Sequence, residues 1–137
     1  MNEIVTYNAK NIIMTIGTHI VTGYAEDSFI TIDPAGDAVT YKVGCQGEVV
    51  RSINPDTSVT VKLVLLYGTR SRDFLSNMVK KDRTDGSGIF PVEIKDLAGE
   101  VILSAKNCWV TKIPSKVYGK EAQNGEYTIL CADPEEF

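Results

Sequence analysis

The sequence has little of the chemistry that catalysis and metal binding require. Its 137 residues include one histidine, His19, and three cysteines, Cys45, Cys108 and Cys131. A Ser–His or Cys–His mechanism would depend on His19 alone. The cysteines are odd in number and lack CxxC spacing, which predicts neither a disulfide framework nor a zinc ribbon and favours a reducing site of synthesis. We therefore expect no enzymatic activity, no metal and no cofactor.

Long apolar segments and a basic charge excess are also missing. The longest aliphatic run covers residues 63–66, whereas a membrane-spanning helix needs about 20 apolar residues. The chain starts without a basic segment followed by an apolar one, so a secretory signal is not expected. The formal net charge is -4, which argues against a protein that grips nucleic-acid phosphates. The sequence thus predicts no membrane partner and no tight nucleic-acid binding.

Local motifs for phosphate or acid–base chemistry are weak. Residues 85–88 read DGSG, which lacks the third glycine and the following helix of a phosphate loop. The carboxylate pairs Glu26–Asp27 and Glu135–Glu136 are adjacent in sequence, and adjacent side chains of a strand point to opposite faces. These acidic residues are therefore interpreted as a solvated surface.

The composition instead fits one packed domain covering residues 1–137. Hydrophobic residues make up 43% of the chain and charged residues 23%, which is close to the average for globular proteins. A chain of this length buries roughly 68% of its unfolded surface on folding. A stable core without disulfides is expected.

Alternation of apolar and polar residues predicts a mainly β protein. Between residues 58 and 66, Val59, Val61, Leu63 and Leu65 occupy one face of an extended segment. Turn chemistry is present at Gly17–Thr18, at residues 96–99 and at Asn124–Gly125. An antiparallel β-sandwich or barrel follows. The expected strands are 11–16, 19–24, 29–33, 39–43, 49–53, 58–66, 90–95, 101–105, 108–112 and 126–132.

One segment, about residues 71–82, has helical periodicity. The apolar residues Phe74, Leu75, Met78 and Val79 fall on one helical stripe. Ser71 is the expected N-cap. A single helix beside a β domain is expected to cover one sheet face or one open end of a barrel.

The pattern of residues 40–54 predicts a projecting β-hairpin that has few large apolar side chains to bury. Its centre is punctuated by glycines, which is typical of a tip that extends from the body. An ordinary connecting hairpin and an assembly arm that adds its backbone to a neighbouring sheet both fit this pattern. In the second interpretation the subunit or ring interface consists of Lys42, Val43, Gly44, Cys45, Gln46, Gly47, Glu48, Val49, Val50 and Arg51. The apolar contact would come from Val43, Val49 and Val50, and Gly44 and Gly47 would allow close backbone approach.

The order of motifs along the chain resembles a known family. The motifs are YNAKNIIMTIG at 7–17, IVTGYA at 20–25, FITI at 29–32, KVGCQGEVVRS at 42–52, GKE at 119–121 and CAD at 131–133. Together they resemble the tail tube proteins of contractile-tailed phages and prophages. The resemblance implies a β-sandwich or barrel with one flanking helix, six copies to a ring, and rings that stack into a hollow tube inside a contractile sheath.

The resemblance also implies partners and a location. The protein would associate with copies of itself and with tail sheath, tape measure and baseplate proteins. It would be located in the virion tail after assembly in the host cytoplasm, and DNA would pass through the lumen without specific binding. Because a basic lumen would retain phosphates, four basic residues are expected to face outward or toward the next ring. They are Arg70, Arg72, Lys80 and Lys81.

Two alternatives remain open at this point. A secreted ring protein of a contractile injection apparatus would share the ring architecture. A small-ligand-binding β-barrel would instead remain monomeric and hold an apolar cavity with a few convergent polar groups.

Overall fold

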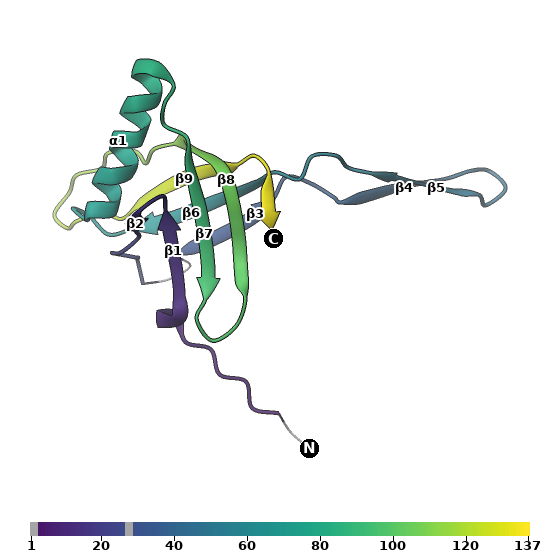
Figure 1. Cartoon of the computed structure of the whole chain (residues 1–137), viewed down its shortest axis with the longest axis horizontal. Coiled ribbons are helices and arrows are strands. Elements are labelled where there is room, and N and C mark those ends of the chain that lie inside the picture. The colour runs from purple at the N-terminus through teal and green to yellow at the C-terminus, as the bar shows by residue number, and fades with distance from the viewer. Residues whose placement is uncertain (1–2, 27–28) are drawn as a thin grey trace.

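The computed structural model describes residues 3–26 and 29–137, so Asp27 of the Glu26–Asp27 pair lies outside the described residues. These described residues form a mainly antiparallel β fold with one α-helix (Figure 1). Its elements are η1 (Ala9–Asn11), β1 (Ile12–Ile16), β2 (His19–Ile20), β3 (Ile30–Pro34), β4 (Val39–Val43), β5 (Val49–Ile53), β6 (Val59–Leu65), α1 (Arg70–Asp85), β7 (Phe90–Asp96), β8 (Val101–Lys112), β9 (Gly125–Cys131) and β10 (Pro134–Glu136).

Most strands belong to one sheet that folds over on itself. The strand order is β2-β1-β7-β8-β9-β6-β3, and β10 pairs with β8. The long strand β8 joins two layers, because its first half pairs with β7 and β10 and its second half pairs with β9. In Figure 1 the strands β1 and β7 run across β9, β6 and β3. The expected sandwich-type antiparallel fold is confirmed.

The core lies between these two layers and follows the predicted alternation. Strand β6 alternates buried and half-buried residues along its whole length, with Val59, Val61, Leu63 and Leu65 inside. Strand β9 has the same pattern and pairs with β6 over seven residue pairs. Apolar side chains at every second position therefore meet in one layer, which is the main source of stability for a fold of this kind.

Helix α1 covers one side of the sheet through the predicted stripe. Leu75 is fully buried, and Phe74, Met78 and Val79 pack against the same core. The helix ends at Gly86, whose φ of 75° is a left-handed conformation that glycine adopts at little cost. The expected N-cap was wrong: Thr69 occupies that position, and Ser71 lies inside the first turn with its side chain directed into the protein.

Several boundaries differ from the sequence-based expectation. The segments 101–105 and 108–112 form one strand, β8, whose pairing with β7 is irregular. Only His19–Ile20 of the expected strand 19–24 forms a regular strand, β2. The chain then crosses from β1 to β6, where Tyr24 makes an isolated bridge with Leu65. The expected turn at Asn124–Gly125 was wrong, since Gly125 is the first residue of β9.

Candidate assembly surface

The most distinctive feature of the molecule is the hairpin formed by β4 and β5, here called the ribbon. Figure 1 shows it extending away from the body as a separate two-stranded sheet. Every residue of both strands is exposed. A two-stranded hairpin without a third strand or a packed face is only marginally stable in water. The ribbon is therefore the segment whose stability would increase most on contact with another molecule.

The ribbon has two chemically different faces, which follow from its register. Residues directly opposite each other share a face, and the register pairs Val39 with Ile53, Tyr41 with Arg51, and Val43 with Val49. These six side chains form the apolar face. The other face, called the polar face, consists of Thr40, Lys42, Val50 and Ser52. Four of the apolar side chains are well exposed: Tyr41 at 71%, Ile53 at 79%, Val49 at 60% and Val43 at 59%.

The hydrogen-bond pattern brings the side chains of the apolar face close together. The backbone N–H of Gly44 donates to the Glu48 carbonyl at 2.7 Å, and that of Asn54 donates to the Ala38 carbonyl at 2.9 Å. The even-numbered residues of the ribbon therefore form the hydrogen-bonded pairs. The residues of the apolar face are odd-numbered and form the non-hydrogen-bonded pairs between them, in which the side chains lie closer together. The outward N–H and C=O groups of both ribbon edges belong to these same odd-numbered residues.

The tip of the ribbon is shaped by a glycine. Gly47 has a φ of 91°, and its N–H donates to the Gly44 carbonyl at 3.0 Å. This is the geometry of a short hairpin loop that needs a residue with positive φ. Cys45 is exposed at the tip. Gly47 is thus explained by the turn itself.

The sequence identified the ribbon but not its faces. The predicted interface residues Lys42 to Arg51 lie together on it, but the structure places Val50 on the polar face with Lys42, away from Val43 and Val49. Tyr41 and Ile53 were missed as apolar contributors. The pairing register would have identified them. Residues whose numbers sum to 92 lie directly opposite each other in the ribbon and therefore share a face.

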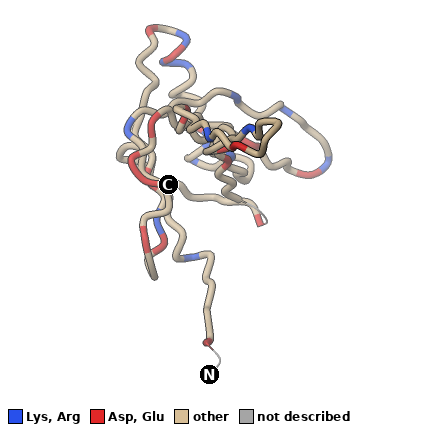
Figure 2. The backbone as a smooth tube through the Cα atoms, turned by 90° about the vertical axis from the view of Figure 1, so that its right-hand side faces the viewer, with Lys and Arg blue, Asp and Glu red and all other residues tan. Residues whose placement is uncertain are grey.

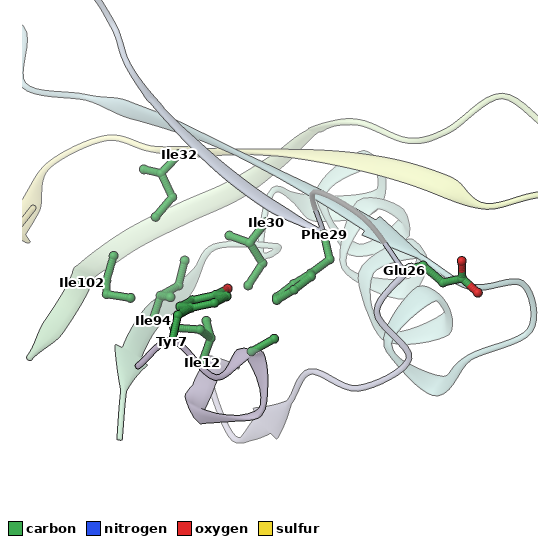
Figure 3. Close-up of a pocket in the computed structure, with 9 residues that line it drawn as sticks. Tyr7, Ile12, Glu26, Phe29, Ile30, Ile32, Ile94 and Ile102 are labelled. Atoms are coloured by element: carbon green, nitrogen blue, oxygen red, sulfur yellow. The ribbon is translucent and has the colours of Figure 1, made fainter. Parts of the chain in front are cut away.

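A second apolar surface lies on the body, between β1 and β3. It is a groove of about 480 Å³. In Figure 3 the isoleucine side chains converge on Tyr7 and Phe29, while Glu26 stands at the rim with its carboxylate pointing away. The nine residues that line the groove are Tyr7, Ala9, Ile12, Glu26, Phe29, Ile30, Ile32, Ile94 and Ile102.

Strand β3 borders this groove with an unpaired edge. The Val64 N–H donates to the Phe29 carbonyl at 3.0 Å, and the Ala35 N–H donates to the Ser58 carbonyl at 3.1 Å. Odd-numbered residues of β3 therefore bond to β6, and the backbone groups of Ile30 and Ile32 point to the opposite side. Over the part of the chain that the structure describes, no strand pairs with β3 on that side. Such an edge is a template for another strand.

The N-terminal segment before η1 adds more uncovered apolar surface. Ile4, Val5 and Tyr7 are exposed at 92%, 87% and 73%, and Figure 1 shows the segment leading away from the body. Scattered exposed apolar residues are normal, but two apolar extensions on one small domain are typical of an interaction surface.

The four basic residues predicted to face away from a lumen differ in exposure. Arg70, Lys80 and Lys81 are exposed, whereas Arg72 is half-buried, lies over the Tyr67 ring at 5.8 Å and donates to the Gln123 carbonyl at 3.5 Å. Figure 2 shows basic and acidic positions interspersed over the body. A mixed surface of this kind gives no single-sign patch along α1.

The structure brings the single histidine to a serine, but not in a catalytic arrangement. His19 Nε2 and Ser71 Oγ are 2.9 Å apart, and Ser71 Oγ also accepts a hydrogen bond from the Thr22 N–H at 2.9 Å. Ser71 is 0% exposed, so no substrate could reach its hydroxyl. The His19 ring stacks on Phe74 at 4.6 Å. The pair therefore connects β2 to α1.

One buried tyrosine has a perturbed acidity. The Tyr24 hydroxyl is buried and makes no hydrogen bond of acceptable geometry within the described residues. Burial raises the pKa of Tyr24 to about 12, and the nearby Met14 backbone offsets this only in part. A pKa shift caused mainly by desolvation, at a half-buried residue that packs against the core, indicates packing and not acid–base chemistry.

The described residues contain neither a metal-binding cluster nor a membrane-spanning helix. Among residues 3–26 and 29–137, no group of three or more His, Cys, Asp or Glu side chains could hold a metal ion. No helix in the described part of the chain has the length and apolar character needed to cross a bilayer.

Comparisons with known proteins agree with this architecture. No family model matches the chain. Structural protein ORF10 of Pseudomonas phage KPP10 is 24% identical over 114 residues, which cover 82% of this chain and 66% of that protein. The chain thus matches just under two thirds of the length of that relative.

Solved structures of contractile injection particles contain chains with the same fold. A chain in the sheath/tube terminator of an extracellular contractile injection system, PVC, has a TM-score of 0.61 at 12% identity and covers 95% of both chains. A chain in the tube-terminating cap of the anti-feeding prophage has a TM-score of 0.56 at 15% identity, with 98% of this chain and 93% of that chain covered. A chain in the PVC sheath–tube complex has a TM-score of 0.58 at 14% identity, covering 94% and 89%.

Proposed function

We propose that this protein is a structural subunit of a contractile tail or contractile injection particle, and that its copies form stacked, six-membered rings of the inner tube. The observation that carries the proposal is the ribbon, whose apolar face has no partner within its own described chain. The likeness in fold to chains of contractile injection particles and the similarity to a phage structural protein support this class of assembly.

The ribbon is the proposed contact between copies, over residues 42–51 with Tyr41 and Ile53 added. In a closed ring of identical copies, every copy makes the same contact with each neighbour, and no contact surface is left uncovered. An exposed, apolar ribbon on a monomer is an aggregation hazard unless a specific partner covers it. Self-assembly gives both the partner and the specificity.

A tube of such rings would act as a conduit. The compact-domain scaling gives a radius of gyration of about 14 Å, and six such spheres enclose a hole of about 36 Å, wide enough for a DNA duplex. The net charge of -4 would repel phosphates, so DNA would pass without being held. In this arrangement Arg70, Lys80 and Lys81 face outward or toward the next ring, and sheath, tape measure and baseplate proteins are the proposed partners.

A tube terminator is a second candidate, because the fold is also shared with chains in a sheath/tube terminator and in a tube-terminating cap. A terminator would form rings that do not stack further. A ligand-binding barrel has less support, since the groove at β3 opens at a sheet edge and has one charged residue in its lining, where a ligand site needs several convergent polar groups.

Negative-stain microscopy of the purified protein after concentration tests the proposal. Stacked rings or long tubes are the expected result, and single rings would favour the terminator. A protein that remains monomeric at every concentration would contradict both candidates.

A further inference from the structure

We propose that the groove beside β3 receives the ribbon of a second copy, which adds to the free edge of β3 with its apolar face toward the groove. This inference rests on the proposed function, because it names the surface that the ribbon contacts. It assigns a partner site on the body that the ribbon alone does not define.

The backbone groups of the two edges match in spacing. The free edge of β3 offers the N–H and C=O groups of Ile30 and Ile32, which point away from β6. Each ribbon strand has five residues, as β3 has. An extended segment added to such an edge gains main-chain hydrogen bonds, and its alternate side chains supply specificity.

The side chains on the groove side also match. Ile30 and Ile32 pair with Leu63 and Val61, so they point to the buried side of the sheet. A strand added beside β3 would therefore place every second side chain over the groove. The ribbon meets this requirement when its apolar face is turned inward, because Tyr41 and Ile53 would then continue the apolar layer between β3 and β1.

The two surfaces carry opposite single charges. Glu26 is the one charged residue among the nine that line the groove, and its carboxylate points outward from the rim (Figure 3). Arg51 is the one charged residue among the six on the apolar face of the ribbon. Neither residue has an ion-pair partner within the described chain. Opposite charges on otherwise apolar surfaces select partner and register.

The ribbon that fills the groove must come from another copy. The ribbon follows β3 after a short connection and points away from the body, as Figure 1 shows. It cannot turn back beside β3 without undoing its own base, where the Asn54 N–H donates to the Ala38 carbonyl. Each copy thus offers one ribbon and one groove, which is the arrangement that closes into a ring.

Charge reversal on the two surfaces tests the pairing. We expect Arg51→Glu and Glu26→Arg to raise the concentration needed for half-maximal assembly by about tenfold or more, because each places like charges together. An equimolar mixture of the two variants should assemble again, since each ribbon then meets a groove of opposite charge in an alternating ring. Sedimentation velocity and microscopy measure assembly, and circular dichroism checks that each variant is folded.

Lys42→Glu is the matched control, because it makes the same charge change on the polar face of the same ribbon. A mixture of Lys42→Glu and Glu26→Arg should not restore the assembly of the Glu26→Arg variant, because Arg51 of either variant still meets a groove that carries arginine. Two results would show that the groove assignment is wrong while the proposed function stands. In the first, Arg51→Glu and Glu26→Arg each assemble as well as the wild-type protein. In the second, the wild-type protein assembles but the mixture of the two variants does not. If the wild type never assembles, both the groove assignment and the proposed function are wrong.

Discussion

Cys108 and Cys131 lie directly opposite each other on β8 and β9, and both side chains are 0% exposed. The Ala132 N–H donates to the Asn107 carbonyl at 3.1 Å, so the next pair along the ladder, Cys108 and Cys131, is a non-hydrogen-bonded one. Such pairs have Cα atoms about 4.5 Å apart, which falls within the range that a disulfide spans. The neighbouring Cys108 thiol and burial together raise the pKa of Cys131, which keeps this thiol protonated and slow to react.

This relationship predicts that slow refolding with oxidised glutathione converts the pair to a disulfide. Two thiols lose two electrons and two protons, glutathione disulfide is reduced to two thiols, and the protein mass falls by about 2 Da. The new link should raise the free energy of unfolding by about 3 kcal/mol through loop closure. The experiment uses Cys45→Ser to remove the exposed thiol, and Cys45→Ser with Cys131→Ala as control. Two thiols that remain titratable in denaturant would contradict the prediction.

Ser71→Ala is expected to lower the free energy of unfolding by about 1–3 kcal/mol, because it removes the buried Ser71 hydroxyl that accepts a hydrogen bond from the Thr22 N–H. His19 would also lose its partner on α1. Urea denaturation followed by circular dichroism measures the change. Ser115→Ala, at an exposed position, serves as control and should stay within about 0.5 kcal/mol of the wild type. An equal effect of both variants would argue against the β2–α1 connection.

Stability is expected to fall as the pH rises from 10 to 12. In this window the unfolded chain loses the Tyr24 proton at the ordinary pKa of 10.0, whereas the folded protein keeps it until about 12. The folded state then binds more protons than the unfolded state, so the free energy of unfolding decreases with pH. Tyr24→Phe should reduce this decrease and leave stability near pH 7 unchanged or slightly higher. The control is Tyr118→Phe, at an exposed side chain, and thermal melts at several pH values measure both.

Much of the fold could be predicted because burial alternates along the strands. The residues of β4, β5 and β6 and the stripe of α1 could be identified from the spacing of apolar residues alone. The alternation breaks down where tertiary contacts dominate. Residues 21–24 belong to the predicted strand 19–24, but they leave β1 and cross to β6, a path that is fixed by the Ala25 N–H donating to the Val64 carbonyl.

The candidate site was predicted only in part, for a related reason. The ribbon is a local feature, so its position could be recognised from the sequence. The groove combines residues of the N-terminal segment, β1, β3, β7 and β8, and no local pattern indicates that Glu26 lines the same groove as Ile30 and Ile94. The role of Ser71 was missed because a serine at a helix start fits an N-cap equally well, and only the approach of His19 and Thr22 distinguishes the two roles.

Deletion of residues 44–48 should leave a folded but monomeric protein. Over residues 3–26 and 29–137 the ribbon shares no sheet with the body, so the core loses none of its packing when the tip is removed. Thermal melting should therefore show one cooperative transition near that of the wild type, and microscopy should show no rings. Long tubes formed by this variant would contradict the assignment of the ribbon as an assembly arm.

The two faces of the ribbon should differ in their importance for assembly. Tyr41→Ser with Ile53→Ser removes two large side chains that are already exposed in the monomer, so the free energy of unfolding should change little. An interface, by contrast, loses about 1–3 kcal/mol for each large apolar side chain that it buries, which predicts at least a tenfold loss of assembly. Thr40→Ala with Ser52→Ala changes a directly opposite pair on the polar face and should assemble like the wild type. Equal assembly of the two double variants, measured by sedimentation velocity at matched concentrations, would show that the apolar face is not what holds the copies together.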